Sequence, residues 1–120
     1  MAELLKLPSF YDERGGLTVL EKTLPFDIKR VYWIYGADGC ERGGHRHHLT
    51  KQAAVCVHGR CEVLIKNQGS ISTHILDAPN ICMILAPEDW HVLKNITHEA
   101  VIMVFASKAY DPQDYIVTPL

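Results

Sequence analysis

Short runs of β-branched, aromatic and aliphatic residues recur along the whole chain, and turn-forming residues separate them. Such runs favour strands, because branched and aromatic side chains pack well on a pleated surface. No long stretch keeps the 3.6-residue apolar period of an amphipathic helix. We therefore expect an all-β sandwich or barrel, with strands near residues 3–7, 17–22, 28–35, 52–57, 61–66, 72–76, 81–85, 91–93 and 100–106.

The length and composition are those of one ordinary globular domain. At 120 residues, with 48% hydrophobic and 22% charged content, the chain can bury about two thirds of its unfolded surface. A net charge of -2 gives no basic surface for nucleic acid, and no apolar run approaches the ~20 residues that span a membrane. We expect a single domain over residues 1–120, with neither nucleic acid nor membrane as a partner.

The four cysteines follow no metal-ligand or redox spacing. Cys56, Cys61 and Cys82 lie in apolar, strand-like runs, and Cys40 follows a glycine-rich turn. Free cysteines behave as small buried hydrophobes, and they persist in a reducing compartment. The first residues also lack the basic start and apolar stretch of a secretory signal. We expect a cytoplasmic protein whose cysteines are free and buried.

Two histidines stand one residue apart in the segment GCERGGHRHHLTKQAAVCVHG, residues 39–59. In a strand, alternate side chains share a face, so the imidazoles of His45 and His47 would point the same way. On the inner face of a small barrel, two groups that titrate near neutral pH would converge. That arrangement serves either proton transfer or metal binding.

The spacing of this segment resembles the first signature of the cupin superfamily, and residues 87–95 resemble the second. The matching residues are Gly39, His45, His47, Gln52 and Gly59 in the first signature, and Pro87, His91 and Asn95 in the second. The resemblance implies a cupin jelly roll, also called a double-stranded β-helix, with its active site at the open mouth.

One departure from the first signature bears on the chemistry. Gln52 stands where cupins usually carry Glu. Metal-binding cupins typically hold an ion with three His and one Glu, whereas the corresponding set here carries no negative charge and consists of His45, His47, Gln52 and His91. We therefore expect neither a metal nor another cofactor. A metal-dependent cupin, for example a dioxygenase, stays open as an alternative, because a Gln carbonyl oxygen can also ligate.

A closer resemblance covers most of the chain. Five segments match the sugar 3,4-ketoisomerases, which are cupins, in order and spacing: YDERGGLTVLE, LPFDIKRVYWIYG, RGGHRHHLTKQ, PEDWHVL and SKAYDPQDYI. Arg46 and His48 are departures, since close relatives often show Ala and Lys there. The resemblance implies an isomerase of dTDP-4-keto-6-deoxyglucose that moves the ketone from carbon 4 to carbon 3 through an enediol, without a redox cofactor.

The resemblance also implies catalytic residues. One imidazole can remove and return a proton, because its usual pKa is about 6.5. We expect His47 to carry the proton between the two carbons and His45 to handle a sugar oxygen; the reverse assignment is open. Tyr32 is a candidate to relay protons to a sugar oxygen, and an aromatic side chain that only lines the barrel is the alternative.

Further residues are candidates for substrate binding, namely Arg14, Arg30, Arg42, Gln52, Trp90 and His91. Guanidinium groups match phosphate geometry with paired donors, so the arginines suit diphosphate or enediolate oxygens. A solvated surface charge is the alternative for each. Trp90 is a candidate to stack on thymine, although aromatic residues in strands more often pack in a core. Arg14 together with His91 resembles family members that form the galacto product.

The resemblance further implies a homodimer, often with exchanged N-terminal strands. Residues 1–8 fit such an arm, because Leu4, Leu5 and Leu7 give a short apolar strand that can add to a partner's sheet. Two more classes stay open: a non-catalytic cupin that only binds sugar nucleotides, and a sugar-nucleotide 3,5-epimerase. The epimerases share the fold and pair a single catalytic His with a Tyr.

Overall fold

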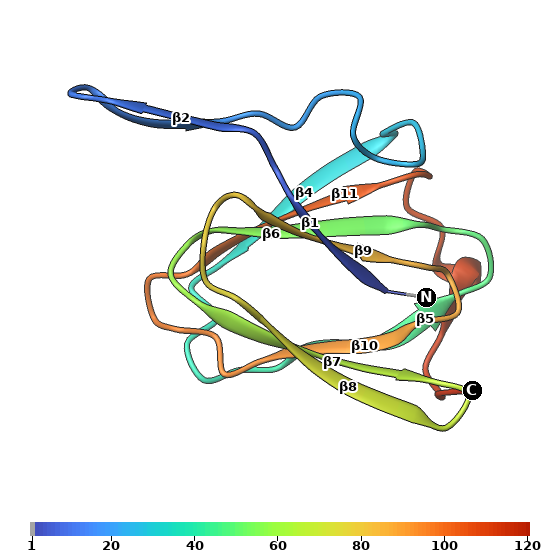
Figure 1. Cartoon of the computed structure of the whole chain (residues 1–120). Coiled ribbons are helices and arrows are strands. Elements are labelled where there is room, and N and C mark those ends of the chain that lie inside the picture. The colour runs from blue at the N-terminus through green and yellow to red at the C-terminus, as the bar shows by residue number, and fades with distance from the viewer. Residues whose placement is uncertain (1) are drawn as a thin grey trace.

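The computed structural model describes residues 2–120, and two facing five-stranded sheets form the body of the molecule (Figure 1). The first sheet has the order β1-β9-β6-β11-β4, the second has the order β12-β5-β10-β7-β8, and β2 and β3 form a separate hairpin. The elements are β1 (Glu3–Lys6), β2 (Ser9–Asp12), β3 (Gly15–Thr18), β4 (Arg30–Tyr35), β5 (Arg42–His47), β6 (Gln52–His58), β7 (Cys61–Asn67), β8 (Ser70–Leu76), β9 (Ile81–Leu85), β10 (Trp90–Lys94), β11 (Val101–Ala106), the 3-10 turn η1 (Pro112–Asp114) and β12 (Tyr115–Ile116). The all-β prediction is confirmed.

From β4 onward the chain passes repeatedly between the sheets. Strands β4, β6, β9 and β11 lie in the first sheet, and β5, β7, β8, β10 and β12 lie in the second. Their pairings are antiparallel throughout. This alternation is the winding of a jelly roll, which brings residues distant in the sequence to the same end of the molecule.

The burial pattern of each strand follows from what covers it. In β7, Cys61, Val63 and Ile65 are buried while Glu62 and Leu64 are half-buried, which is the alternation of a sheet with one face on the core. In β6, five successive residues are buried, because the segment before β4 covers the outer face of the first sheet. There Leu20, Leu24 and Phe26 pack on a cluster of Leu7, Ala53, Val55, Cys82 and Ile84.

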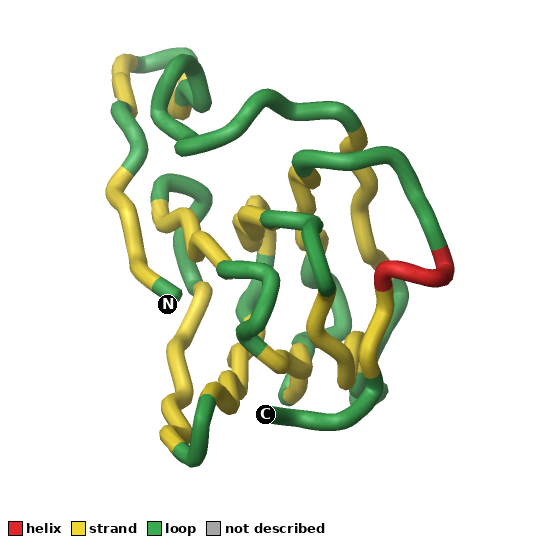
Figure 2. The backbone as a smooth tube through the Cα atoms, turned by 90° about the vertical axis from the view of Figure 1, so that its right-hand side faces the viewer, coloured by secondary structure: helices red, strands yellow, loops and turns green. Residues whose placement is uncertain are grey.

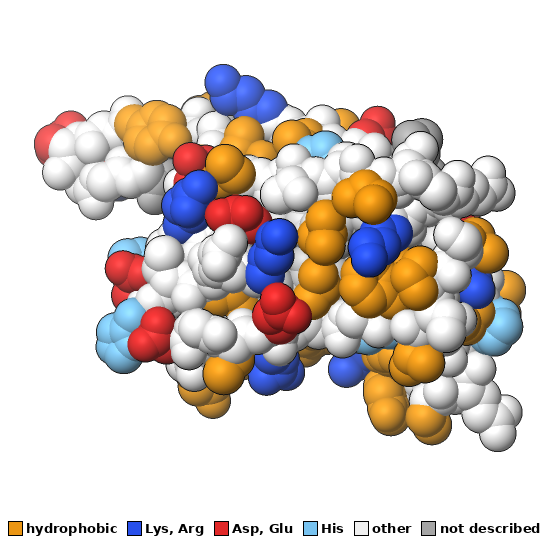
Figure 3. All heavy atoms as spheres, turned by 90° about the horizontal axis from the view of Figure 1, so that it is seen from below, with side chains coloured by type: hydrophobic (Ala, Val, Ile, Leu, Met, Phe, Trp, Pro, Cys, Tyr) orange, Lys and Arg blue, Asp and Glu red, His pale blue; other side chains and the backbone are white. Residues whose placement is uncertain are grey.

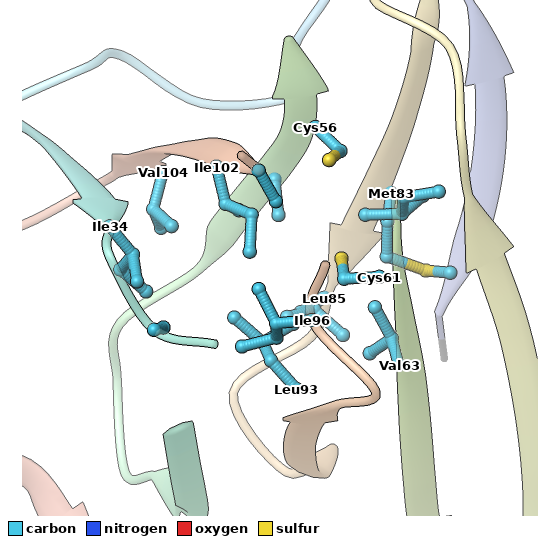
Figure 4. Close-up of a cluster of buried hydrophobic side chains, with 14 of the residues drawn as sticks. Ile34, Cys56, Cys61, Val63, Met83, Leu85, Leu93, Ile96, Ile102 and Val104 are labelled. Atoms are coloured by element: carbon cyan, nitrogen blue, oxygen red, sulfur yellow. The ribbon is translucent and has the colours of Figure 1, made fainter. Parts of the chain in front are cut away.

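The main core lies between the sheets. Ile34, Ile102 and Val104 from the first sheet face Val63 and Leu93 from the second (Figure 4). Cys56 and Cys61 belong to this cluster, and Cys82 to the outer one. All four cysteines are free, as predicted. The prediction of burial is wrong for Cys40, which is exposed because it lies in the loop before β5 and not in a strand that faces a core.

Some strands differ from the sequence-based expectation. The predicted strand at 17–22 is instead β3, Gly15–Thr18, because Ser9–Asp12 pairs with it across a two-residue turn. The expected strands also did not include Ser9–Asp12, Arg42–His47 and Tyr115–Ile116. Glycine pairs are turn signals in a sequence, but here Gly15-Gly16 and Gly43-Gly44 lie inside strands.

The hairpin β2–β3 extends away from both sheets, as Figures 1 and 2 show from two sides. It exposes Phe10, Tyr11 and Leu17. Figure 3 shows the molecule from the side of the second sheet, where apolar side chains gather near the middle of the face with basic and acidic side chains beside them. Within residues 2–120 we find no helix with the length and hydropathy needed to cross a membrane.

Gly59, in the turn between β6 and β7, is expected to be essential for stability. Its φ is +77°, and a Cβ there would lie 2.7 Å from the Ala100 Cα and from the Thr97 Oγ1. Gly36 is a matched control, with φ +63° but open space around its Cα. Gly59→Ala should therefore lose about 1–3 kcal/mol more unfolding free energy than Gly36→Ala, measured by urea titration of tryptophan fluorescence. Equal losses would contradict this packing argument.

Candidate active site

Three histidines from two neighbouring strands meet at one end of the molecule. His45 and His47 lie on β5, and His91, on β10, is the direct ladder partner of His45. The ring centroid of His45 lies 5.1 Å from that of His47 and 5.1 Å from that of His91. His47 and His91 are buried and His45 is half-buried. The structure thus brings together the predicted histidine pair and the histidine of the second signature.

Glycine lets these two strands approach closely. Gly43 has a φ of +95°, and a Cβ on it would lie 3.1 Å from the carbonyl oxygen of His91. The register between β5 and β10 shifts between His91 and Val92. The backbone N–H of His47 then donates to the carbonyl of Pro87 at 2.7 Å, which ties the end of β5 to the loop before β10.

The first sheet supplies the opposite side of the site. The amide Nε2 of Gln52 donates to the Tyr32 hydroxyl at 3.3 Å, and the Arg30 guanidinium lies 4.5 Å from the centre of the Tyr32 ring. Arg30 is half-buried and also donates to the hydroxyl of Tyr115 at 3.4 Å. The predicted residues Tyr32, Arg30 and Gln52 are therefore neighbours, and Arg30 connects them to the second sheet.

Burial keeps the histidines neutral. It lowers the pKa of His47 from 6.5 to about 4, with further lowering by the neighbouring His45 and His91. It also lowers the pKa of His91 to about 4, although the carbonyl of Asp89 accepts a hydrogen bond from the ring. Burial lowers the pKa of His45 as well. Nε2 of His47 is buried and has no hydrogen-bond partner within residues 2–120.

Burial favours the protonated form of the Tyr32 phenol. It raises the pKa of the phenol above 10, and the nearby Tyr115 raises it further. At neutral pH the site therefore offers neutral imidazoles, which can accept a proton, beside a phenol that can donate one. Within the described range 2–120, no group of three His, Cys, Asp or Glu side chains is arranged to hold a metal ion.

Three of the predicted binding residues lie outside this cluster. Trp90 faces the other side of β10 from His91; its Nε1 donates to the Val117 carbonyl at 3.0 Å, and its ring packs against Lys66. Arg42 is exposed at the start of β5. Arg14 lies at the tip of the β2–β3 hairpin, exposed and paired with Asp12.

The structure adds residues that the sequence prediction missed. The Tyr115 ring lies 4.7 Å from His45 and 4.6 Å from His47 between centroids, and Tyr110 lies beside it. The buried carboxylate of Asp114 accepts hydrogen bonds from the backbone N–H groups of Leu49 and Thr50 at 2.9 and 3.1 Å. The segment SKAYDPQDYI was a signal for these residues, because it matched the family pattern, but it has no strand-like alternation.

The comparisons with known proteins agree with this geometry. The family model FdtA, described as WxcM-like, C-terminal, matches residues 1–119. A relative from Aneurinibacillus thermoaerophilus, named TDP-4-oxo-6-deoxy-alpha-D-glucose-3,4-oxoisomerase, is 37% identical over 117 residues, which cover 95% of this chain and 84% of the relative.

Solved structures of ketoisomerases superpose on nearly the whole chain. The QdtA 3,4-ketoisomerase of Thermoanaerobacterium thermosaccharolyticum, a double mutant in complex with TDP, has a TM-score of 0.94 at 34% identity and covers 98% of this chain and 87% of its own. The WlaRB TDP-quinovose 3,4-ketoisomerase of Campylobacter jejuni has a TM-score of 0.92 at 32% identity, covering 98% and 92%.

Fold and site together define a cupin enzyme of sugar-nucleotide chemistry, and the jelly-roll prediction is confirmed. Three histidine side chains lie close together at one end of the roll. Within the class, the chain belongs to the FdtA, WxcM-like family. The predicted relationship to the sugar 3,4-ketoisomerases is confirmed.

The neutral histidines predict how stability depends on pH. Because burial lowers the pKa of His47 to about 4, the unfolded chain takes up a proton at a higher pH than the folded one does. Stability is therefore full above about pH 6.5 and falls as the pH decreases toward 4. We expect His47→Asn to reduce this fall, measured as the urea midpoint between about pH 7 and pH 4.5. The exposed neighbour is the control: His48→Asn should keep the wild-type dependence, and equal slopes in all three proteins would contradict the prediction.

Proposed function

We propose that this chain is an isomerase that converts dTDP-4-keto-6-deoxyglucose into a dTDP-3-keto-6-deoxyhexose by proton transfer through an enediol. One observation carries the proposal: Nε2 of His47 is buried without a partner among the described residues, next to a second imidazole. An unpaired buried nitrogen is costly in the empty protein, and a bound substrate would give it a partner. The names of the relatives support the same reaction.

In the first step His47 removes the proton from carbon 3. Its imidazole is neutral at neutral pH because burial lowers its pKa to about 4, so Nε2 can accept the proton. The electrons of the C3–H bond form a C3–C4 double bond, and the carbonyl oxygen on carbon 4 takes a proton. His45 interacts with that oxygen, and Tyr32 relays the proton to it. Burial raises the pKa of the Tyr32 phenol, so the phenol carries a proton that it can donate at neutral pH.

In the second step the protons move in the opposite sense. The hydroxyl on carbon 3 returns a proton to the group that protonated the oxygen on carbon 4, and a ketone forms at carbon 3. His47 gives its proton to carbon 4. Every acid and base regains its original state and no electron leaves the substrate, so the reaction balances without a redox cofactor.

Positive charge and hydrogen-bond donors for the substrate come from several elements. Arg30 lies over the Tyr32 ring, where it can stabilise negative charge on the enediol oxygens. Gln52 and His91 complete the sugar-facing surface, and the exposed Arg42 suits the diphosphate. The configuration at carbon 4 is the finer part of the proposal: Arg14 with His91 resembles family members that form the galacto product.

Proton NMR of dTDP-4-keto-6-deoxyglucose in heavy water tests the reaction. The wild type should exchange the carbon 3 proton and form a 3-keto product whose couplings report a galacto carbon 4. The rate of His47→Asn should be at least about 100-fold lower than that of the wild type, whereas His48→Asn should keep the wild-type rate. EDTA should leave the rate unchanged.

Other outcomes of this experiment would contradict the proposal in distinct ways. Exchange at carbons 3 and 5 without ketone migration would indicate an epimerase. Loss of activity in EDTA would indicate a metal-dependent cupin. Thermal stabilisation by the sugar nucleotide without turnover would indicate a binding protein.

We further propose that the enzyme works in the cytoplasm as a homodimer in which the β2–β3 hairpin reaches the partner's site. Within its own chain, Arg14 sits on a hairpin that extends away from the sheets (Figure 1). The hairpin exposes Phe10 and Tyr11, and the first sheet exposes Trp33, at 57%. A second copy would cover these apolar side chains. Within one chain, β1 pairs with β9. If residues 1–8 were exchanged between two copies, each β1 would form the same ladder with the partner's β9.

Complementation tests the contribution of the partner. Arg14→Ala and His47→Asn, each expected to be inactive alone, are mixed by co-expression of differently tagged chains. If Arg14 serves the partner's site, the mixed dimer has one complete site and should recover up to about half of the wild-type rate per dimer. Recovery absent in purified mixed dimers would contradict the proposal, and a monomeric wild type in sedimentation would exclude it.

A further inference from the structure

Tyr115 lies against both histidines of β5 but has no part in the proton transfers proposed above. Strand β12 has only two residues, and it pairs with β5 so that Tyr115 stands opposite His47. Directly opposed residues of antiparallel strands project from the same face. The Tyr115 ring therefore meets both histidines of β5, at 4.7 and 4.6 Å between centroids and at interplanar angles of 61° and 63°.

We propose that Tyr115 is a positioning residue whose ring sets the orientation of the His45 and His47 imidazoles during proton transfer; the inference rests on the proposed function. Edge-to-face contacts are the preferred geometry of aromatic pairs. Here one ring makes such a contact with each imidazole, while the two imidazoles are themselves close to perpendicular, at 85°. Rotation of either imidazole about χ2 would change the interplanar angle of 61° or 63° that it makes with Tyr115.

The Tyr115 ring is itself fixed from two directions. Its hydroxyl accepts a hydrogen bond from Arg30 on β4, at 3.4 Å. Its backbone follows Asp114, whose buried carboxylate binds the loop immediately after His47 through Leu49 and Thr50. The carbonyl of Asp114 also accepts from the His48 N–H at 3.0 Å. A two-residue ladder alone is short, so the contacts of Asp114 with the loop after His47 are the main anchor of the ring against the histidines, and the Arg30 hydrogen bond, at 3.4 Å, is the weaker one.

Positioning by the ring predicts a specific pattern of variants. Tyr115→Leu keeps apolar volume but removes the planar ring, and we expect kcat to fall about 10–100-fold with KM changed less than about threefold. Tyr115→Phe keeps the ring and loses only the hydroxyl, so it should restore kcat to within about threefold of wild type. Val117→Ala is the control from the same segment, because its side chain is 75% exposed.

Each alternative result overturns the inference. A Tyr115→Leu enzyme with wild-type kcat would show that the ring does not orient the histidines. A Tyr115→Phe enzyme as slow as Tyr115→Leu would assign the effect to the hydroxyl instead. A rise in KM with kcat unchanged would make Tyr115 a substrate contact. Thermal unfolding of each variant identifies losses due to misfolding, and those are excluded from the comparison.

A readout independent of turnover separates this inference from the proposed function. Nitrogen-15 NMR of the imidazoles reports how His45 and His47 titrate in the absence of substrate. Tyr115→Leu should change these signals and Val117→Ala should not, even if the wild type fails to isomerise the sugar nucleotide. Unchanged histidine signals in Tyr115→Leu would refute the positioning role regardless of the enzyme's reaction.

Discussion

The pairing of β5 with β10 is the constraint on which the site depends. Their ladder sets His45 opposite His91, and the absence of a side chain on Gly43 leaves room for the His91 carbonyl. Strand β12 then adds to the other edge of β5 and brings Tyr115 to the same face. Strands β10 and β12 hold β5 between them. In that position, Tyr115 accepts the hydrogen bond from Arg30, which connects the site to the first sheet.

The electrostatic character of the site follows from how its carboxylates are used. Asp89 accepts hydrogen bonds from the Asn67 amide and the Ala86 backbone, and Asp114 accepts them from Leu49 and Thr50. Both acids thus stabilise turns beside the histidines. Burial outweighs the attraction of these two acids, so the histidines stay neutral. Such imidazoles suit proton transfer to and from carbon.

Most strands and part of the candidate site could be predicted from the sequence. Strands such as β6, β7 and β9 were predicted within one residue at each end, because their apolar runs end at turn residues. The convergence of His45 and His47 was predictable because residues two apart in a strand project from the same face. Strand β5 was harder to predict, since Gly43 and Gly44 resemble a turn. Tyr115 was missed because two residues have no periodicity. Strand alternation could have placed Trp90 on the face opposite His91, where the structure has it.

The late position of β12 in the sequence has a consequence for biosynthesis. Tyr115 pairs with a strand that leaves the ribosome nearly seventy residues earlier, and antiparallel partners so distant can pair only when both have been made. A nascent chain that already contains every histidine still lacks the ring that contacts two of them. The site described here is therefore complete only once β12 has been made and has paired with β5.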